Sequence, residues 1–168
     1  FSIGTKGYLG TGLDSTTTYL QDFWEYDPGT NLWIPKANFG GGPRWRAVGI
    51  SIGTLGYLGT GISPGNVQNN DFWEYNPATN IWTQKSNYGG PVSWAYGGFS
   101  IGTRGYVGAG ANTNAFWEYD PGTDTWTKKA DLKVFSMFAN VSFSIGTNGY
   151  IGTGGSWTKD FWKYCTVP

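Results

Sequence analysis

One aromatic segment of eleven residues returns along this chain and limits the folds that it can adopt. Its first copy, Phe23–Trp33, reads FWEYDPGTNLW. Two further copies are complete and a fourth is partial: Phe72–Trp82, Phe116–Trp126 and Phe161–Tyr164. A second block begins with Ser-Ile-Gly-Thr, and its copies start at Ser2, Ser51, Ser100 and Ser144. These copies are 49, 49 and 44 residues apart. A period of this length indicates stacked supersecondary units rather than an irregular globular core.

The composition favours strands joined by tight turns. Glycine accounts for 28 of the 168 residues and aromatic residues for 18% of the chain, while only 13% of the residues are charged. Abundant glycine disfavours helices, whereas aromatic residues favour strands. The aromatic content also argues against disorder. An all-β fold is therefore expected.

Each repeat unit is expected to contain four short strands, as the second unit illustrates. Its hydrophobic and aromatic segments alternate with Gly-rich or Asn-Pro turns. The expected strands are 46–52, 57–60, 72–75 and 81–84, separated by a turn at 53–56, a variable loop at 61–70 and a turn at 76–80. Four strands per unit and a period of 40 to 50 residues are typical of a β-propeller. A sandwich of hairpins is the alternative, but nothing in a sandwich requires the sequence to repeat.

The two repeated blocks resemble the kelch repeat. The resemblance lies in Gly-Tyr-Leu-Gly-Thr-Gly after a hydrophobic strand, then Asp-Phe-Trp-Glu-Tyr-Asp-Pro, then a tryptophan seven residues after the tyrosine. The usual Gly-Gly doublet is replaced by Gly-Thr-Gly or Gly-Ala-Gly. The sequence of these blocks is similar to that of secreted, surface-attached kelch proteins of Bacteroidetes-type bacteria, which implies an extracellular or cell-surface location. The resemblance covers nearly the whole chain and implies a propeller of four-stranded antiparallel blades.

We expect a single domain with repeat units at about 1–43, 44–92, 93–136 and 137–168. These units supply fifteen strands, which is less than four full blades, whereas kelch propellers usually have six or seven. Three arrangements remain open at this stage: a piece of a longer propeller, a ring closed by two copies, or a small ring of four blades. An open arrangement would expose unpaired backbone and tryptophan-rich faces.

Several functional classes find no support in the sequence. The chain has no histidine, which removes the commonest general base and most transition-metal sites. The formal net charge is zero, so no basic field favours nucleic acid. No hydrophobic run is long enough to span a membrane, and Cys165 is the single cysteine. We expect no cofactor, no metal, no nucleic-acid partner and no membrane insertion.

The repeated residues are interpreted as packing positions rather than as a binding or catalytic site. Binding residues diversify between blades, whereas the tryptophans at 24, 73, 117 and 162 recur in register. Glu25, Glu74 and Glu118 alternate with aromatic residues along a strand, and Lys163 takes their place in the last copy. Exposed or cross-strand paired carboxylates are therefore expected there. Asp27 and Asp120 are expected to cap turns rather than to bind calcium.

Function should lie where the repeats differ. In a meander of four strands, the loops after the second and fourth strands lie on one face, and these are the divergent loops. At the entry to the first strand of successive blades lie Trp45, Trp94 and Phe138. The tentative ligand-binding set adds neighbouring residues of these loops; it is Arg44, Trp45, Arg46, Trp94, Tyr96, Phe138 and Trp157. Aromatic rings beside arginines suit a glycan or a peptide, although the rings could instead fill the central channel.

These observations predict a non-catalytic binding module that presents variable loops to a protein or carbohydrate ligand. The first alternative is a structural subunit that pairs through its open blade edges, as a homo-oligomer or with blades from a longer chain. The second is an enzyme. Galactose oxidase shares the kelch-like fold, but its copper chemistry needs histidine. A carboxylate-based hydrolase would have to rely on Asp14 and Asp131, which belong to different blades.

Overall fold

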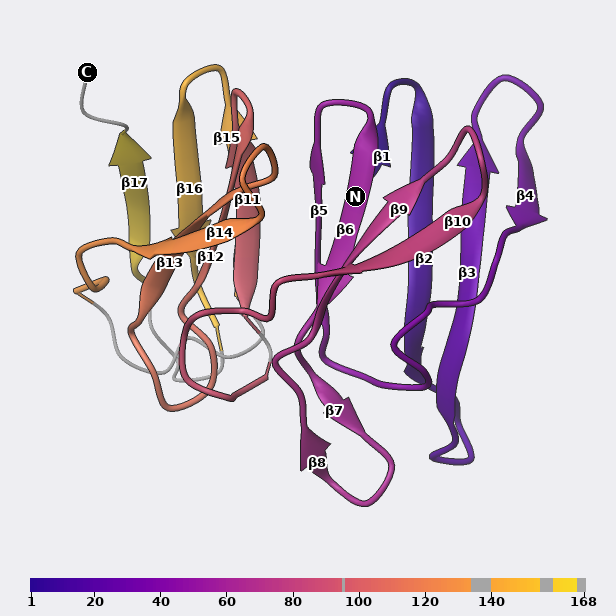
Figure 1. The fold of residues 1–168 in the computed structure, drawn as a ribbon, viewed down its shortest axis with the longest axis horizontal. Coiled ribbons are helices and arrows are strands. Elements are labelled where there is room, and N and C mark those ends of the chain that lie inside the picture. The colour runs from indigo at the N-terminus through magenta and orange to yellow at the C-terminus, as the bar shows by residue number, and fades with distance from the viewer. Residues whose placement is uncertain (95, 134–139, 155–158, 166–168) are drawn as a thin grey trace.

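The computed structural model describes residues 1–94, 96–133, 140–154 and 159–165, and these contain strands and turns but no helix. The strands follow one another as antiparallel hairpins (Figure 1). Their bounds are β1 Ser2–Ile3, β2 Lys6–Leu13, β3 Tyr19–Asp27, β4 Leu32–Pro35, β5 Val48–Ile52, β6 Leu55–Gly59, β7 Ile62–Ser63, β8 Val67–Gln68, β9 Phe72–Asn76, β10 Ile81–Lys85, β11 Gly97–Ile101, β12 Arg104–Gly108, β13 Phe116–Asp120, β14 Thr125–Lys128, β15 Val141–Ile145, β16 Asn148–Gly152 and β17 Phe161–Cys165.

The strands form the four blades of a β-propeller, which confirms the predicted fold class. Blade 1 is β1-β2-β3-β4, blade 2 is β5-β6-β9-β10, blade 3 is β11-β12-β13-β14 and blade 4 is β15-β16-β17. The innermost strands contact one another in the order β1, β5, β11, β15. β15 and β1 make no comparable contact, and in Figure 1 blades 1 and 4 extend to opposite sides of the molecule. The described blades therefore form an open arc.

The strand boundaries differ from the predicted ones in three places. β5 starts at Val48 rather than at Arg46, because Arg46 has a φ of 58° and cannot continue a strand. Ile52 pairs directly with Leu55, so the expected four-residue turn contains only Gly53 and Thr54. The loop expected at 61–70 contains a short hairpin of its own, β7–β8. A two-residue turn needs positive φ, which Gly53 supplies at 60°.

The turns after the third strands are capped as the sequence predicted. The backbone N–H of Gly29 donates to Asp27 Oδ1, and the N–H of Gly122 donates to Asp120 Oδ1, each at 2.9 Å. Asn76 accepts from Ala78 in the same way. These carboxylates also pair with lysine or arginine from the neighbouring strand. The acidic residues at these turns are thus used within their own blade.

The repeated glutamates lie opposite tyrosines on the second strand of each blade. The hydroxyl of Tyr8 donates to Glu25 at 2.6 Å, and that of Tyr57 donates to Glu74 at 2.7 Å. Burial alone would raise the pKa of Glu25, but the hydrogen bonds from Tyr8 and Lys36 outweigh it and lower the pKa. The prediction of cross-strand paired carboxylates is confirmed at these positions.

The core lies between the blades rather than within any one of them. Phe72 of blade 2 meets Tyr119 of blade 3 at 5.1 Å and Trp126 at 5.0 Å between ring centroids, both edge to face. Phe23 of blade 1 meets Tyr75 and Trp82 of blade 2 in the same arrangement. Such contacts are favoured by the ring quadrupoles. One side of blades 1, 2 and 3 therefore packs on the opposite side of the next blade, and the aromatic repeat encodes this contact.

The upper and lower sides of the blades in Figure 1 differ in their turns and loops. The tight turns lie at the upper end of Figure 1, while the longer connections, including the β7–β8 hairpin, lie at the lower end. We call the lower end of Figure 1 the loop face.

Among the described residues no helix is long and hydrophobic enough to cross a membrane.

Candidate functional site

Two tryptophans from neighbouring blades meet through one arginine on the loop face. The guanidinium carbon of Arg46 lies 3.9 Å from the centroid of the Trp45 ring and 4.0 Å from that of the Trp94 ring. Trp45 and Arg46 precede β5 of blade 2, and Trp94 precedes β11 of blade 3. The structure thus brings together three of the residues that the sequence analysis proposed. We call Trp45, Arg46 and Trp94 the Trp–Arg–Trp stack.

Backbone hydrogen bonds hold both tryptophans. Trp45 forms an isolated antiparallel bridge with Ile62, in which each residue donates to the carbonyl of the other at 3.0 and 2.9 Å. The carbonyl of Trp94 accepts from the N–H of Ala111 at 3.0 Å. Ile62 and Ala111 follow the same Gly-Thr-Gly or Gly-Ala-Gly segment in their respective blades. The two indoles therefore project from equivalent positions of the repeat.

Arg46 is exposed and its backbone is left-handed, with a φ of 58°. A residue other than glycine, asparagine or aspartate is uncommon in this region, which costs roughly 1 kcal/mol or more. Among the described residues no hydrogen bond or ion pair engages the Arg46 side chain. The guanidinium carbon lies over both rings, and the N–H groups of the exposed side chain are the part that can bind acceptor oxygens.

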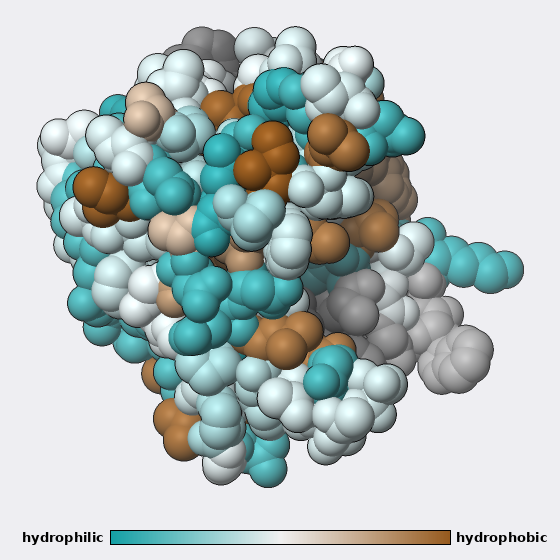
Figure 2. All heavy atoms as spheres, turned by 90° about the vertical axis from the view of Figure 1, so that its right-hand side faces the viewer, coloured by the Kyte–Doolittle hydropathy of each residue, from teal (hydrophilic) through white to brown (hydrophobic). Residues whose placement is uncertain are grey.

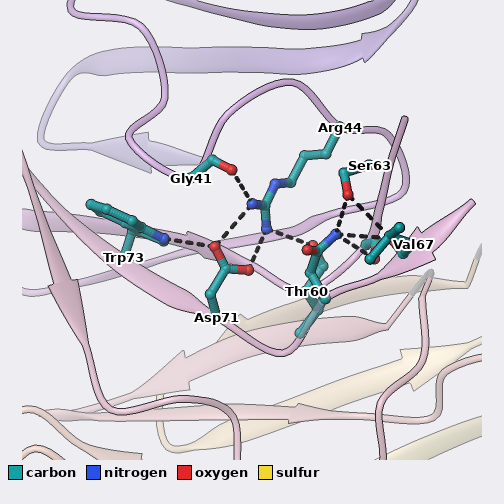
Figure 3. A network of polar contacts seen from close by, with 9 residues as sticks. Gly41, Arg44, Thr60, Ser63, Val67, Asp71 and Trp73 are labelled. Carbon is teal, nitrogen blue, oxygen red and sulfur yellow. Dashed lines mark hydrogen bonds and ion pairs between the residues drawn. The ribbon is translucent and has the colours of Figure 1, made fainter. Parts of the chain in front are cut away.

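Arg44 differs from its neighbour, because it is buried and serves the fold. Only 1% of Arg44 is exposed. Its guanidinium donates to both oxygens of Asp71, at 2.5 and 2.9 Å, and to the carbonyls of Thr60 and Gly41 (Figure 3). The Phe39 ring lies 4.6 Å from the guanidinium carbon. Arg44 is therefore not available to a ligand, and we remove it from the candidate site.

The Arg44–Asp71 pair connects the loop that enters blade 2 to the third strand of that blade. Asp71 also accepts from the indole N–H of Trp73 at 2.8 Å (Figure 3). Blade 3 carries Ser93 and Ala115 at the two corresponding positions, so both charges are replaced together. In blade 3 the Ser93 hydroxyl instead donates to the carbonyl of Ala111 at 2.6 Å. The sequence signal for the pair is that blades 2 and 3 differ at both positions at once.

Tyr96 is buried beside the site rather than exposed in it. Its hydroxyl donates to the carbonyl of Pro91 at 2.5 Å, and its ring lies 4.9 Å from that of Tyr88. Burial raises the pKa of Tyr96 to about 12. Tyr96 therefore positions the loop that carries Trp94. Phe138 and Trp157, the remaining predicted site residues, lie outside the described residues.

The inner strands of the four blades line a hollow of about 350 Å³. Its walls include serines at corresponding positions of the repeat, and Ala47 and Tyr96 also line it. Ala47 directly follows Arg46 and Tyr96 lies two residues after Trp94, so the backbone that carries the Trp–Arg–Trp stack leads into the wall of this hollow. The serines at corresponding positions are Ser2, Ser51, Ser100 and Ser144.

The two carboxylates considered for hydrolysis hold their own loops. Asp14 accepts from Thr16 and Thr18, and the hydrogen bond from the Thr16 hydroxyl is the main cause that lowers the Asp14 pKa. Asp131 forms an ion pair with Lys128 at 3.2 Å. Within the described part of the chain no cluster of three histidine, cysteine, aspartate or glutamate residues could hold a metal. Cys165 is exposed, and its thiol donates to Asn148 at 3.2 Å.

Comparison with known proteins shows likeness at the level of structure. No protein-family model matches the chain, and no curated protein matches it. Among solved structures 155 chains are similar. One of them, titled "Structure of YjhT", is 14% identical, has a TM-score of 0.71 and is covered over 56% of its length by 90% of this chain. The present chain therefore spans a little over half of that chain, and the likeness concerns the fold alone.

Proposed function

We propose that this chain is a non-catalytic binding module that holds a protein or carbohydrate ligand on its loop face. The observation that carries the proposal is the Trp–Arg–Trp stack, in which the guanidinium of an exposed arginine lies over two indole rings from neighbouring blades. Stacking keeps the side chain ordered before a ligand arrives, which reduces the entropy lost on binding. The free N–H edge can then donate to carboxylate, carbonyl or hydroxyl oxygens.

The position of the stack supports the same proposal. It joins the loops that enter two neighbouring blades, next in sequence to residues that line the central hollow, and these loops differ from blade to blade. Propellers commonly bind ligands through such variable loops on a rigid scaffold. The repeats resemble kelch repeats of secreted, surface-attached bacterial proteins, so we propose a kelch-type module that works outside the cell or at its surface.

A test uses glycan and peptide arrays probed with the wild-type chain and three variants. Trp45→Ala and Trp94→Ala remove the two faces of the stack, and Arg46→Lys keeps the charge but loses the planar fork. We expect each variant to lose at least about tenfold in signal on the same spots, since one such contact contributes about 1.4 kcal/mol or more.

Ile81→Ala is the control, because Ile81 is an exposed hydrophobic residue at the start of the outer strand β10 and belongs neither to the loop face nor to an open blade face. The control should keep the wild-type pattern. Equal signals from the wild type and the three stack variants would remove the proposed site, and the absence of any specific spot for the wild type would remove the proposed ligand classes.

A further inference from the structure

We propose that the two end blades of the arc together form a docking surface for a second copy of this chain. The structure leaves open one face on blade 4 and the opposite face on blade 1. We call the open face of blade 4 the fourth-blade face; it consists of Val141, Phe143, Ile145, Tyr150 and Phe161. We call the open face of blade 1 the first-blade face; it consists of Gly7, Leu9, Tyr26 and Trp33. Elsewhere in the molecule the equivalents of these residues are the blade-to-blade contact.

The fourth-blade face carries residues that other blades bury. Ile145 is 62% exposed, whereas its equivalent Ile52 in blade 2 is 5% exposed. Phe161 is 54% exposed, whereas Phe72 is fully buried. Phe143, Tyr150 and Phe161 nevertheless stack on one another at 5.3 to 5.9 Å, as the equivalent rings of blade 3 do. The face has the form of a blade interface with its partner absent from the described residues.

The first-blade face is open in the complementary way. Leu9 is 63% exposed, whereas Leu58 at the same position of blade 2 is 5% exposed. Trp33 is half exposed and lies 5.1 Å from Tyr26, in the arrangement that Trp82 and Tyr75 use to hold Phe23. Figure 2 views the molecule from the side of blade 1 and shows hydrophobic side chains scattered among pale ones. Tyrosine and tryptophan rank as pale on that scale, so the face is more aromatic than its colour suggests.

Glycines show that the first-blade face has room for a ring. A Cβ on Gly56 would lie 2.7 Å from Phe1, and one on Gly105 would lie 2.7 Å from Ile50, because the preceding blade fills the space above each glycine. Gly7 occupies the same position in blade 1, and a Cβ there meets only Tyr26 of its own blade, at 3.6 Å. We infer that Phe143 of a second copy lies above Gly7 as Phe1 lies above Gly56.

A second copy fits because this chain carries both halves of the contact. Blades 2 and 3 lie between blades 1 and 4, so one open face lies at each end of the arc. A twofold axis between two copies would place each fourth-blade face on the first-blade face of the other copy, which leaves neither face open. The chain matches 56% of one structurally similar chain, so a single copy spans only part of the length of that chain.

The test measures molar mass by sedimentation against protein concentration. The wild type should double its mass as the concentration rises and should not grow further, since the twofold arrangement is closed. Gly7→Asp blocks one face and Phe161→Asp blocks the other. Each change affects both contacts of the dimer, so we expect at least about a 100-fold higher dissociation constant. Ile81→Asp alters an exposed hydrophobic residue on the edge strand of blade 2 and should change nothing.

A mixture of the two face variants sharpens the test. The Gly7→Asp variant keeps an intact fourth-blade face, and the Phe161→Asp variant keeps an intact first-blade face. In a dimer of the two variants these intact faces form one unaltered contact. The mixture should therefore associate at lower concentration than either variant alone, and equal melting temperatures of the single chains would show that both variants fold. A wild type that stays a single chain up to millimolar concentration would overturn the proposal. So would a dimer that neither variant weakens, or growth into long polymers.

Discussion

Blades 2 and 4 carry almost the same strands, yet their hydrophobic faces have opposite surroundings. In blade 2 the face of Val48, Ile50 and Ile52 is covered by blade 3, and all three residues are buried. In blade 4 the corresponding face exposes Val141, Phe143 and Ile145. The inner strands do not explain the difference, because β15 pairs with β16 in the same register as β5 with β6, and Tyr150 stacks on Phe161 as Tyr57 does on Phe72. The repeat therefore specifies one half of an interface between blades, and the interface is complete only where another blade follows.

The largest expected effect separates the two equivalent phenylalanines. Phe72→Ala removes a ring packed against Tyr119 and Trp126 and leaves a cavity, so unfolding should become easier by about 3–5 kcal/mol. Phe161→Ala changes a half-exposed ring and should cost less than about 1 kcal/mol in the dilute single chain. Denaturant unfolding of both variants measures the difference. Equal losses would show that the two faces are equally buried.

A second prediction compares the loop ends of blades 2 and 3. Arg44→Ala leaves Asp71 without its buried partner, and we expect a loss of about 3 kcal/mol in the free energy of unfolding. The double variant Arg44→Ser with Asp71→Ala copies the residues of blade 3 and should recover part of this loss. Thermal and denaturant unfolding provide the measurement. A double variant less stable than Arg44→Ala would contradict the interpretation of the pair as a replaceable link.

The smallest expected effect is a loss of stability at alkaline pH that comes from the buried interface between blades 2 and 3. Burial, together with hydrogen bonds to Glu74 and Asp124, raises the pKa of Tyr57 and of Tyr119 above the ordinary value of 10.0. A folded pKa above the unfolded one means that stability is fully present below pH 10 and is lost as the pH rises through the folded pKa. Melting temperature should therefore fall steadily above pH 10, and Tyr119→Phe should reduce that slope. An unchanged slope in Tyr119→Phe would contradict this.

Much of the fold could be predicted from the repeat, for a physical reason. The segment Phe72–Trp82 and its copies combine a strand, a capped turn and the packing rings, so each copy carries the information for its blade. The local exceptions could not be predicted in this way. Arg46 takes a positive φ, and the β7–β8 hairpin forms inside a loop; neither follows from the residues that repeat.

The candidate site was predictable in part. Aligning the repeats placed Trp45 and Trp94 at equivalent positions, and the structure adds that Arg46 lies between them. Arg44 appeared equally suitable in sequence but points inward to Asp71, a residue 27 positions away. A pattern of residue types along a loop does not distinguish an exposed guanidinium from a buried one. Only the partner across the blade decides it.

The most direct measurement is hydroxyl-radical labelling with mass spectrometry on the dilute single chain. We expect Phe161 and Leu9 to be labelled many times faster than Phe72 and Leu58, which are the same residue types at the same repeat positions. The labelling of Phe161 and Leu9 should fall as the chain concentration rises, while that of Phe72 and Leu58 stays low. Equal protection of Phe161 and Phe72 in the single chain would contradict the open faces.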